Sequence, residues 1–220
     1  TVPMLFESEE KEGITHARLL QSIPGPFIYE SVGTLLESAT ATNNRVFISF
    51  PVDEALYKPE YAEVLHTTLE KFGPVEWKAI SMTNEIHGHT GIYSIIGAKL
   101  GIRAMEYFNV GINNMEVISF AGNQPPLSCF NDGIQISTGA TIGQGLITIS
   151  DSIYAVPTAI FEFNDQQVKI SLKPGIAEQM REDIRYGVQT YGLLTDPYWL
   201  YIEELTLRYW SEFSRFEICD

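Results

Sequence analysis

Two short segments near the middle of the chain hold the residues best suited to chemistry. His87-Gly88-His89 contains two of the four histidines, and Cys129 is one of only two cysteines. Imidazole and thiolate are the side chains that bind zinc and similar metals most readily. Positions two apart in an extended segment share a face, so a strand-to-helix junction would bring both imidazoles to one point. The pattern indicates a metal site, although a helix-capping histidine beside a surface histidine would give the same sequence.

Cys129 stands where we expect a helix to begin, with Ser128 as its N-cap. Unpaired backbone N–H groups and the helix dipole stabilise a thiolate at such a position. A buried cysteine acting as a small apolar residue is the alternative. Asp132 and Gln135 lie three apart and would share a helical face, where they could accept an imidazole N–H or hold a water molecule. Asp132 could equally support the first turn of its helix.

Composition excludes several classes of partner. The chain has 220 residues, enough for one sizeable core. Its formal net charge of −14 repels phosphate backbones and anionic lipid, so we expect neither nucleic acid nor membrane as partner. Two cysteines could form at most one disulfide, which favours a reduced, cytoplasmic setting. Because the sequence begins at Thr1, a leader or signal peptide could have been removed.

Hydrophobic periodicity and turn residues predict an α+β fold, with a mixed sheet packed against helices and a C-terminal helical arm. We expect a core domain over residues 1–172 and a helical extension over 173–220, packed on the core or on a dimer partner. Gly97 and Gly101 predict a close approach by another backbone. Helices are expected after the turn at 24–26, ending near 38, and at 59–72, 92–108, 175–191 and 196–213. Strands are expected at 45–50, 75–82, 115–120, 146–150, 155–163 and 167–172.

Three blocks of residues in the middle of the chain resemble a known family. His87-Gly88-His89-x-Gly91, Gly97-x-Lys99-x-Gly101-x-Arg103 and the segment from Pro125 to Gly145 are similar, in order and spacing, to the formylmethanofuran dehydrogenase E-subunit family. The resemblance covers about residues 85–163. Tyr198-Trp199 and Tyr209-Trp210 extend it to the tail of some longer members. It implies an α+β core, a homodimer, and metal near the histidine and cysteine segments.

Carried over residue by residue, the resemblance makes His87, His89 and Cys129 the candidate metal ligands. Gln135, Thr138 and Thr141 become candidate cofactor-binding residues. The chain departs from the family at two points. Many members have Cys-Pro where this chain has Gly91-Ile92, and many carry a C-terminal zinc ribbon, whereas here Cys219 stands alone.

Three functions agree with these residues. Three protein ligands would leave an open position on zinc, or alternatively iron, as in a metal-dependent hydrolase or lyase acting on a small molecule. Glu85 or Asp132 would then carry the proton. The same ligands could instead belong to a metal-binding accessory protein of a larger redox enzyme. The third hypothesis is metal-free, with Cys129 as a nucleophile activated by its helix terminus and a histidine.

Overall fold

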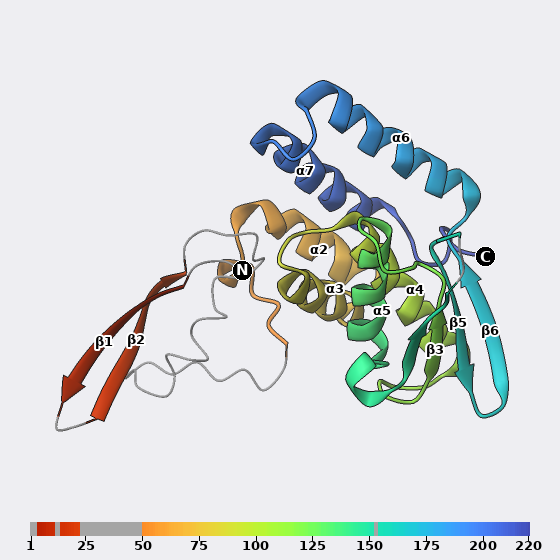
Figure 1. Cartoon of the computed structure of the whole chain (residues 1–220), viewed down its shortest axis with the longest axis horizontal. Helices are drawn as coiled ribbons and strands as arrows, with labels where there is room; N and C mark the ends of the chain where they lie inside the picture. Colours follow the sequence, from red (N-terminus) through yellow and green to blue (C-terminus); the bar gives the residue numbers. More distant parts are fainter. Residues whose placement is uncertain (1–3, 12–13, 23–49, 152–153) are drawn as a thin grey trace.

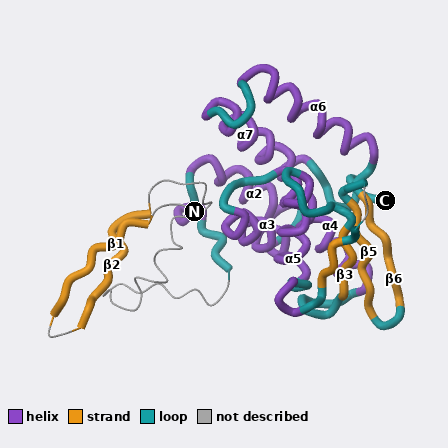
Figure 2. Tube along the Cα trace, in the orientation of Figure 1, coloured by secondary structure: helices purple, strands orange, loops and turns teal. Residues whose placement is uncertain are grey.

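A computed structural model describes residues 4–11, 14–22, 50–151 and 154–220. These residues form the α+β fold predicted from the sequence, with a helical layer beside a mixed sheet (Figures 1 and 2). The helices are α2 (Ala62–Lys71), α3 (Pro74–His87), α4 (Ile92–Phe108), α5 (Phe130–Thr138), α6 (Pro174–Tyr191) and α7 (Asp196–Glu212). The strands are β1 (Met4–Lys11), β2 (Ile14–Ser22), β3 (Glu116–Ser119), β4 (Ile147–Ile149), β5 (Thr158–Phe163) and β6 (Gln166–Ser171).

The main sheet has the order β4-β3-β5-β6. Strand β3 runs parallel to β4 and antiparallel to β5, and β5 pairs with β6 through a short hairpin turn at Asn164 and Asp165. The crossover between the parallel pair β3 and β4 contains α5. Along the sequence, the helix that follows Cys129 therefore lies between two strands that are neighbours in the sheet. The three strands expected from residue 146 onward are confirmed.

Helix α4 is the centre of the fold. From Ile92 to Ile102 every residue of this helix is buried, among two groups of core side chains, whereas Arg103, Glu106 and Tyr107 in its last turns reach the surface. One group lies between α4, α5 and the sheet, and the other lies between α4, α2 and α3. Because α3 and α5 contact α4 from different sides, this helix fixes the relative positions of the segments that carry the two histidines and the cysteine.

Glycine allows α4 and α5 to pack closely. A Cβ atom at Gly97 would lie 2.0 Å from the carbonyl oxygen of Phe130, and one at Gly133 would lie 2.0 Å from that of Ser94. A Cβ at Gly101 would meet the Ser137 hydroxyl at 2.1 Å. The predicted close approach is confirmed, with backbone contact at Gly97 and side-chain contact at Gly101. Any larger residue at these positions would force the helices apart.

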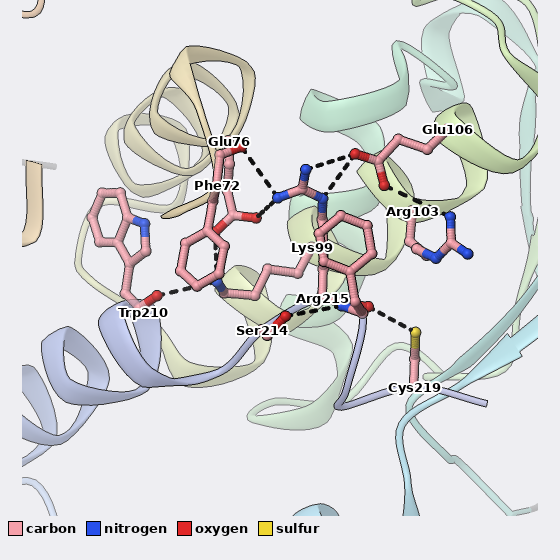
Figure 3. A network of polar contacts seen from close by, with 10 residues as sticks. Phe72, Glu76, Lys99, Arg103, Glu106, Trp210, Ser214, Arg215 and Cys219 are labelled. Atoms are coloured by element: carbon pink, nitrogen blue, oxygen red, sulfur yellow. Dashed lines mark hydrogen bonds and ion pairs between the residues drawn. The ribbon is translucent and has the colours of Figure 1, made fainter. Parts of the chain in front are cut away.

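A buried network of charges ties the C-terminal segment to α3 and α4 (Figure 3). Nζ of Lys99 lies 2.5 Å from Oε1 of Glu76, and both side chains are fully buried. Lys99 also donates to the backbone oxygen of Trp210 at 3.1 Å. Arg215 binds the second oxygen of Glu76 at 2.9 Å and contacts Glu106 at 2.6 Å. Glu76 therefore pairs with both cations and Glu106 supplies the second negative charge, although burial still lowers the pKa of Lys99.

The strand expected at residues 75–82 is wrong, because this segment is the first part of α3. Gly73 does end α2, but Pro74 then starts a new helix. At the first position of a helix the backbone N–H has no partner within the helix, so proline loses no hydrogen bond there. Trp77, Ile80 and Asn84 are fully buried at three- and four-residue spacing, as expected for one face of a helix. The segment therefore reaches His87 as a helix, and the expected strand-to-helix junction is a junction between two helices.

The remaining expectations have different outcomes. Helices at 59–72, 92–108, 175–191 and 196–213 are confirmed within a few residues, the first as a 3-10 turn leading into α2. The predicted helix at 26–38 and most of the strand at 45–50 lie outside the described residues. The sequence patterns do not predict the antiparallel pair β1–β2. Among the helices of the described ranges, none combines the length and apolar character needed to cross a bilayer.

Candidate functional site

The two histidines lie at the junction between α3 and α4. His87 is the last residue of α3, and Gly88 ends the helix in the left-handed conformation with φ of +82°. Glycine adopts that conformation without strain. The chain reverses there and returns His89 against His87, so that the two ring centroids lie 4.3 Å apart with planes tilted by 42°. The structure therefore brings both imidazoles together, by a helix cap and not by strand alternation.

His87 is oriented by Asp132 from the first turn of α5. Nδ1 of His87 lies 2.7 Å from Oδ2 of Asp132, and the histidine side chain is only 9% exposed. Burial alone would lower the pKa of His87, but the bond to Asp132 and the neighbouring Cys129 outweigh it and raise the pKa to about 9. The other nitrogen, Nε2, is buried and makes no hydrogen bond of normal geometry within the described residues.

His89 has the opposite electrostatic environment. Burial, followed by the charge of His87, lowers its pKa to about 4. Its ring stands edge-on to the indole of Trp199 in α7, with centroids 5.5 Å apart. At neutral pH this imidazole is uncharged, which leaves a ring nitrogen with a lone pair.

Cys129 approaches the same place from the start of α5. It ends the 3-10 turn Leu127–Cys129 and directly precedes the first residue of α5, so the expected position at a helix start is confirmed, one residue from the predicted boundary. Ser128 makes no side-chain cap there. Both cysteines of the chain are free thiols. Within the described residues, no three His, Cys, Asp or Glu side chains are already grouped as a set that could hold a metal ion.

Gly91, the N-cap of α4, packs against the histidine pair. A Cβ atom there would lie 3.0 Å from Nε2 of His87 and 2.8 Å from the hydroxyl of Ser94. Its φ of −108° is one that any residue adopts. The absence of a side chain at position 91 therefore leaves room for the His87 ring, whose Cδ2 would lie 2.9 Å from a Cβ atom there.

The three residues expected to bind a cofactor make contacts with nearby backbone. Gln135 accepts a hydrogen bond from the backbone N–H of Ile142, and Thr141 caps the short 3-10 turn that follows. The hydroxyl of Thr138 donates to the Ile134 carbonyl at 2.6 Å. Thr138 ends α5, a helix about 13 Å long at 1.5 Å per residue, so it lies far from Cys129 at the other end. Their role toward a cofactor stays a prediction.

The other acidic and histidine candidates are spread over the molecule. Glu85 lies in the last turn of α3, where its charge contributes to the raised pKa of Tyr57. Its proposed role as a general base stays a prediction. His66 is exposed on α2 and pairs with Glu54 at 2.7 Å, as expected for a surface histidine. The side chain of His16 lies outside the described part of the chain.

A cavity of about 330 Å³ opens beside His89, lined by His89, Thr90, Trp199, Ile202 and Glu203. Behind it lies the fully buried Tyr61, whose hydroxyl lies 2.5 Å from that of Thr90 and donates to Glu203 at 3.0 Å. Sequence patterns do not predict this cavity. The aromatic spacing of residues 198–213 correctly predicts core positions such as Tyr209, but Trp199 is 41% exposed and faces the site.

These observations define an α+β protein with a histidine pair at a helix junction, held by an aspartate from the neighbouring helix. Residues 86–191 match the family described as "FmdE, Molybdenum formylmethanofuran dehydrogenase operon", and this part of the chain is an FmdE-like core domain. The predicted resemblance is confirmed, and the match extends it to the end of α6. Helix α7 lies beyond the matched residues. No curated protein matches the sequence.

Proposed function

We propose that the chain is a zinc-binding protein whose ligands are His87, His89 and Cys129, with iron as the alternative metal. The observation that carries the proposal is the pairing of Nδ1 of His87 with Asp132, which leaves Nε2 buried without a normal hydrogen bond. Metal-binding histidines usually donate their second ring N–H to a carboxylate in this way. A buried polar atom with no partner is costly, so such an atom in a native site calls for a ligand.

The donor set fits zinc better than a harder metal. Two imidazoles and one thiol are nitrogen and sulfur ligands, and three protein ligands leave one position open. His89 is neutral at pH 7, as a ligand must be, whereas His87 must lose its proton on binding. The three side chains are neighbours and not yet a ligand set, so metal binding would also reorient at least one of them.

When bound, zinc would supply Lewis-acid chemistry toward a small molecule. Asp132 would hold the His87 ring in one orientation, and Trp199 would cover one side of His89. We therefore infer a metal-dependent hydrolase or lyase, with Glu85 as the candidate proton carrier. An accessory protein that holds the metal for a larger redox enzyme is the other use of the same ligands.

Metal analysis of tag-free protein by mass spectrometry tests the ligands. We expect close to one zinc per chain, lost in Cys129→Ser and in His89→Ala. Matched controls are Cys219→Ser and His66→Ala, which remove the other cysteine and an exposed histidine. Zinc retained in Cys129→Ser, or absent from the wild type after reconstitution, would overturn the proposal.

A second function is favoured by the position of His87 between Asp132 and Cys129. A nucleophile, a base and a group that orients the base form the arrangement of cysteine hydrolases. Here the protonated His87 ring would pair with the Cys129 thiolate, the thiolate would add to an acyl carbon, and His87 would pass its proton to the group that leaves. Alkylation of metal-free protein, followed by peptide mass spectrometry with Cys219 as internal reference, tests this function. Cys129 should react faster than Cys219, and Asp132→Asn should remove the difference.

A further inference from the structure

The lining of the cavity beside His89 has a charged part and an apolar part. Glu203 supplies the charge, and Trp199 and Ile202 supply the apolar surface. All three come from α7, whereas His89 and Thr90 come from the loop before α4. At about 330 Å³ the cavity lies at the small end of ligand pockets, so it suits a compact molecule.

The surroundings of the Glu203 carboxylate favour a positively charged ligand. Tyr61 donates to Oε1, and since it has one proton, the hydroxyl of Thr90 must donate to Tyr61. Within the described ranges, no lysine, arginine or histidine lies within ion-pair distance of Glu203, although the carboxylate is half-buried. A partly desolvated carboxylate is stabilised by a cation that supplies the missing counter-charge.

The apolar part of the lining favours a cation that also carries alkyl groups. The half-exposed indole of Trp199 is part of the lining, and an indole ring attracts ammonium groups electrostatically. Among the described residues no lysine or arginine lines the cavity, so an anion would meet the repulsion of Glu203 without a cationic partner there. The net charge of −14 adds to the same preference by drawing cations toward the surface.

We propose that this cavity binds a small organic cation, an ammonium group on a compact alkyl body, between Glu203 and Trp199. The ammonium would pair with the Glu203 carboxylate, and its alkyl groups would contact the indole and Ile202. The bound molecule would lie against His89. That this cation is the substrate rests on the function proposed above. That the cavity binds it does not depend on that function.

Choline and 3,3-dimethylbutan-1-ol test the charge at constant shape, because they differ only in a quaternary nitrogen in place of a carbon. A quaternary nitrogen has no lone pair and cannot bind metal. Binding is measured on metal-free, chelator-treated protein by calorimetry, with tryptophan fluorescence as a second signal. We expect saturable choline binding and an alcohol at least about tenfold weaker, a difference within the range of a cation over an indole and a carboxylate.

Glu203→Gln should remove that preference, since the amide keeps the hydrogen bond from Tyr61 and loses only the charge. Glu204→Gln, one residue along on the exposed side of α7, is the matched control and should bind choline as wild type does. Equal binding of the alcohol, an unchanged Glu203→Gln, or no saturable binding of choline would each overturn the proposal. Choline binding in a chain that takes up no zinc would overturn the metal proposal alone.

Discussion

His87 and Asp132, 45 residues apart in the chain, are joined by a 2.7 Å contact between Nδ1 and Oδ2. This contact connects the last residue of α3 to the first turn of α5, across the N-terminal end of α4. It holds the imidazole in one ring orientation, which determines the nitrogen that is left for a ligand. The properties of the site therefore depend on Asp132 although this residue is not among the proposed ligands.

Asp132→Asn should weaken zinc binding by about 10- to 100-fold, the usual effect of losing a carboxylate behind a ligating histidine. The amide can still accept a hydrogen bond, so the fold should be kept. Competition titration against a chromogenic chelator measures the affinity. Asp196→Asn, an exposed acid in the first turn of α7, is the control and should leave it unchanged.

The stability of the metal-free protein should be highest near pH 6.5. The pKa of His87 is raised to about 9, so its contribution is complete below pH 6.5 and is lost as pH rises toward 9. The pKa of His89 is lowered to about 4, so stability also falls as pH drops from 6.5 toward 4. Urea denaturation across this range measures both limbs. Asp132→Asn should flatten the alkaline limb, and an unchanged slope there would show that the contact to His87 does not control the titration.

Gly91→Cys should tighten zinc binding by about tenfold or more, because a thiolate ligand would be added next to Nε2 of His87. The backbone at position 91 accepts any residue, but a Cβ there requires the Ser94 hydroxyl at 2.8 Å to rotate and the His87 ring, with Cδ2 at 2.9 Å, to shift slightly. Gly91→Ala introduces the same Cβ without sulfur and should bring no gain. If both variants bind zinc equally, position 91 does not face the metal.

Glu76→Gln should lower the free energy of unfolding by about 3–5 kcal/mol, since it leaves the buried cations Lys99 and Arg215 without their shared carboxylate. Lys99→Met should cost less, because Glu76 keeps its pairing with Arg215. Urea denaturation gives both values. The control substitutions Glu63→Gln and Lys78→Met, each at an exposed residue, should change stability by less than about 0.5 kcal/mol.

Gly97→Ala should destabilise the protein by about 1–3 kcal/mol or more, since its Cβ would meet the Phe130 carbonyl at 2.0 Å. Because Phe130 follows Cys129 directly, zinc affinity should fall as well. Gly175→Ala, in the first turn of α6 with open space around it, should be neutral or stabilising by about 0.5 kcal/mol. Equal unfolding free energies for the two variants would contradict the close packing of α4 on α5.

Long and strongly periodic segments can be predicted from the sequence. The helix at 92–108 has one regular apolar pattern, and the strands after residue 146 are separated by clear turn residues. The first turns of α3 resemble a strand because Val75, Trp77 and Ile80 give them strand composition. The helical spacing of this segment becomes visible only when the pattern is followed to Asn84.

The parts of the site that depend on tertiary contacts cannot be predicted in the same way. The contact of Asp132 with an imidazole is one of two interpretations of the sequence, and only the packing of α5 on α3 decides between them. The cavity brings Thr90, from the loop before α4, together with Glu203 of α7, and the hydroxyl of Tyr61 contacts both from behind, without a local pattern in the sequence. The buried Lys99 has a visible signal, a lysine within an apolar helix. The homodimer and the cytoplasmic location stay predictions.

The buried charges also set an order of events during synthesis. Glu76 and Arg215 are 139 residues apart, so at ribosomal rates Arg215 is made on the order of ten seconds later. Until then, helices α3 and α4 can pair Glu76 only with Lys99, and Glu106 lacks its guanidinium partner. The nascent chain therefore holds the helix that carries His87 in an incomplete environment. The final packing around the histidine pair must follow the emergence of Trp199 and Arg215 from the ribosomal tunnel.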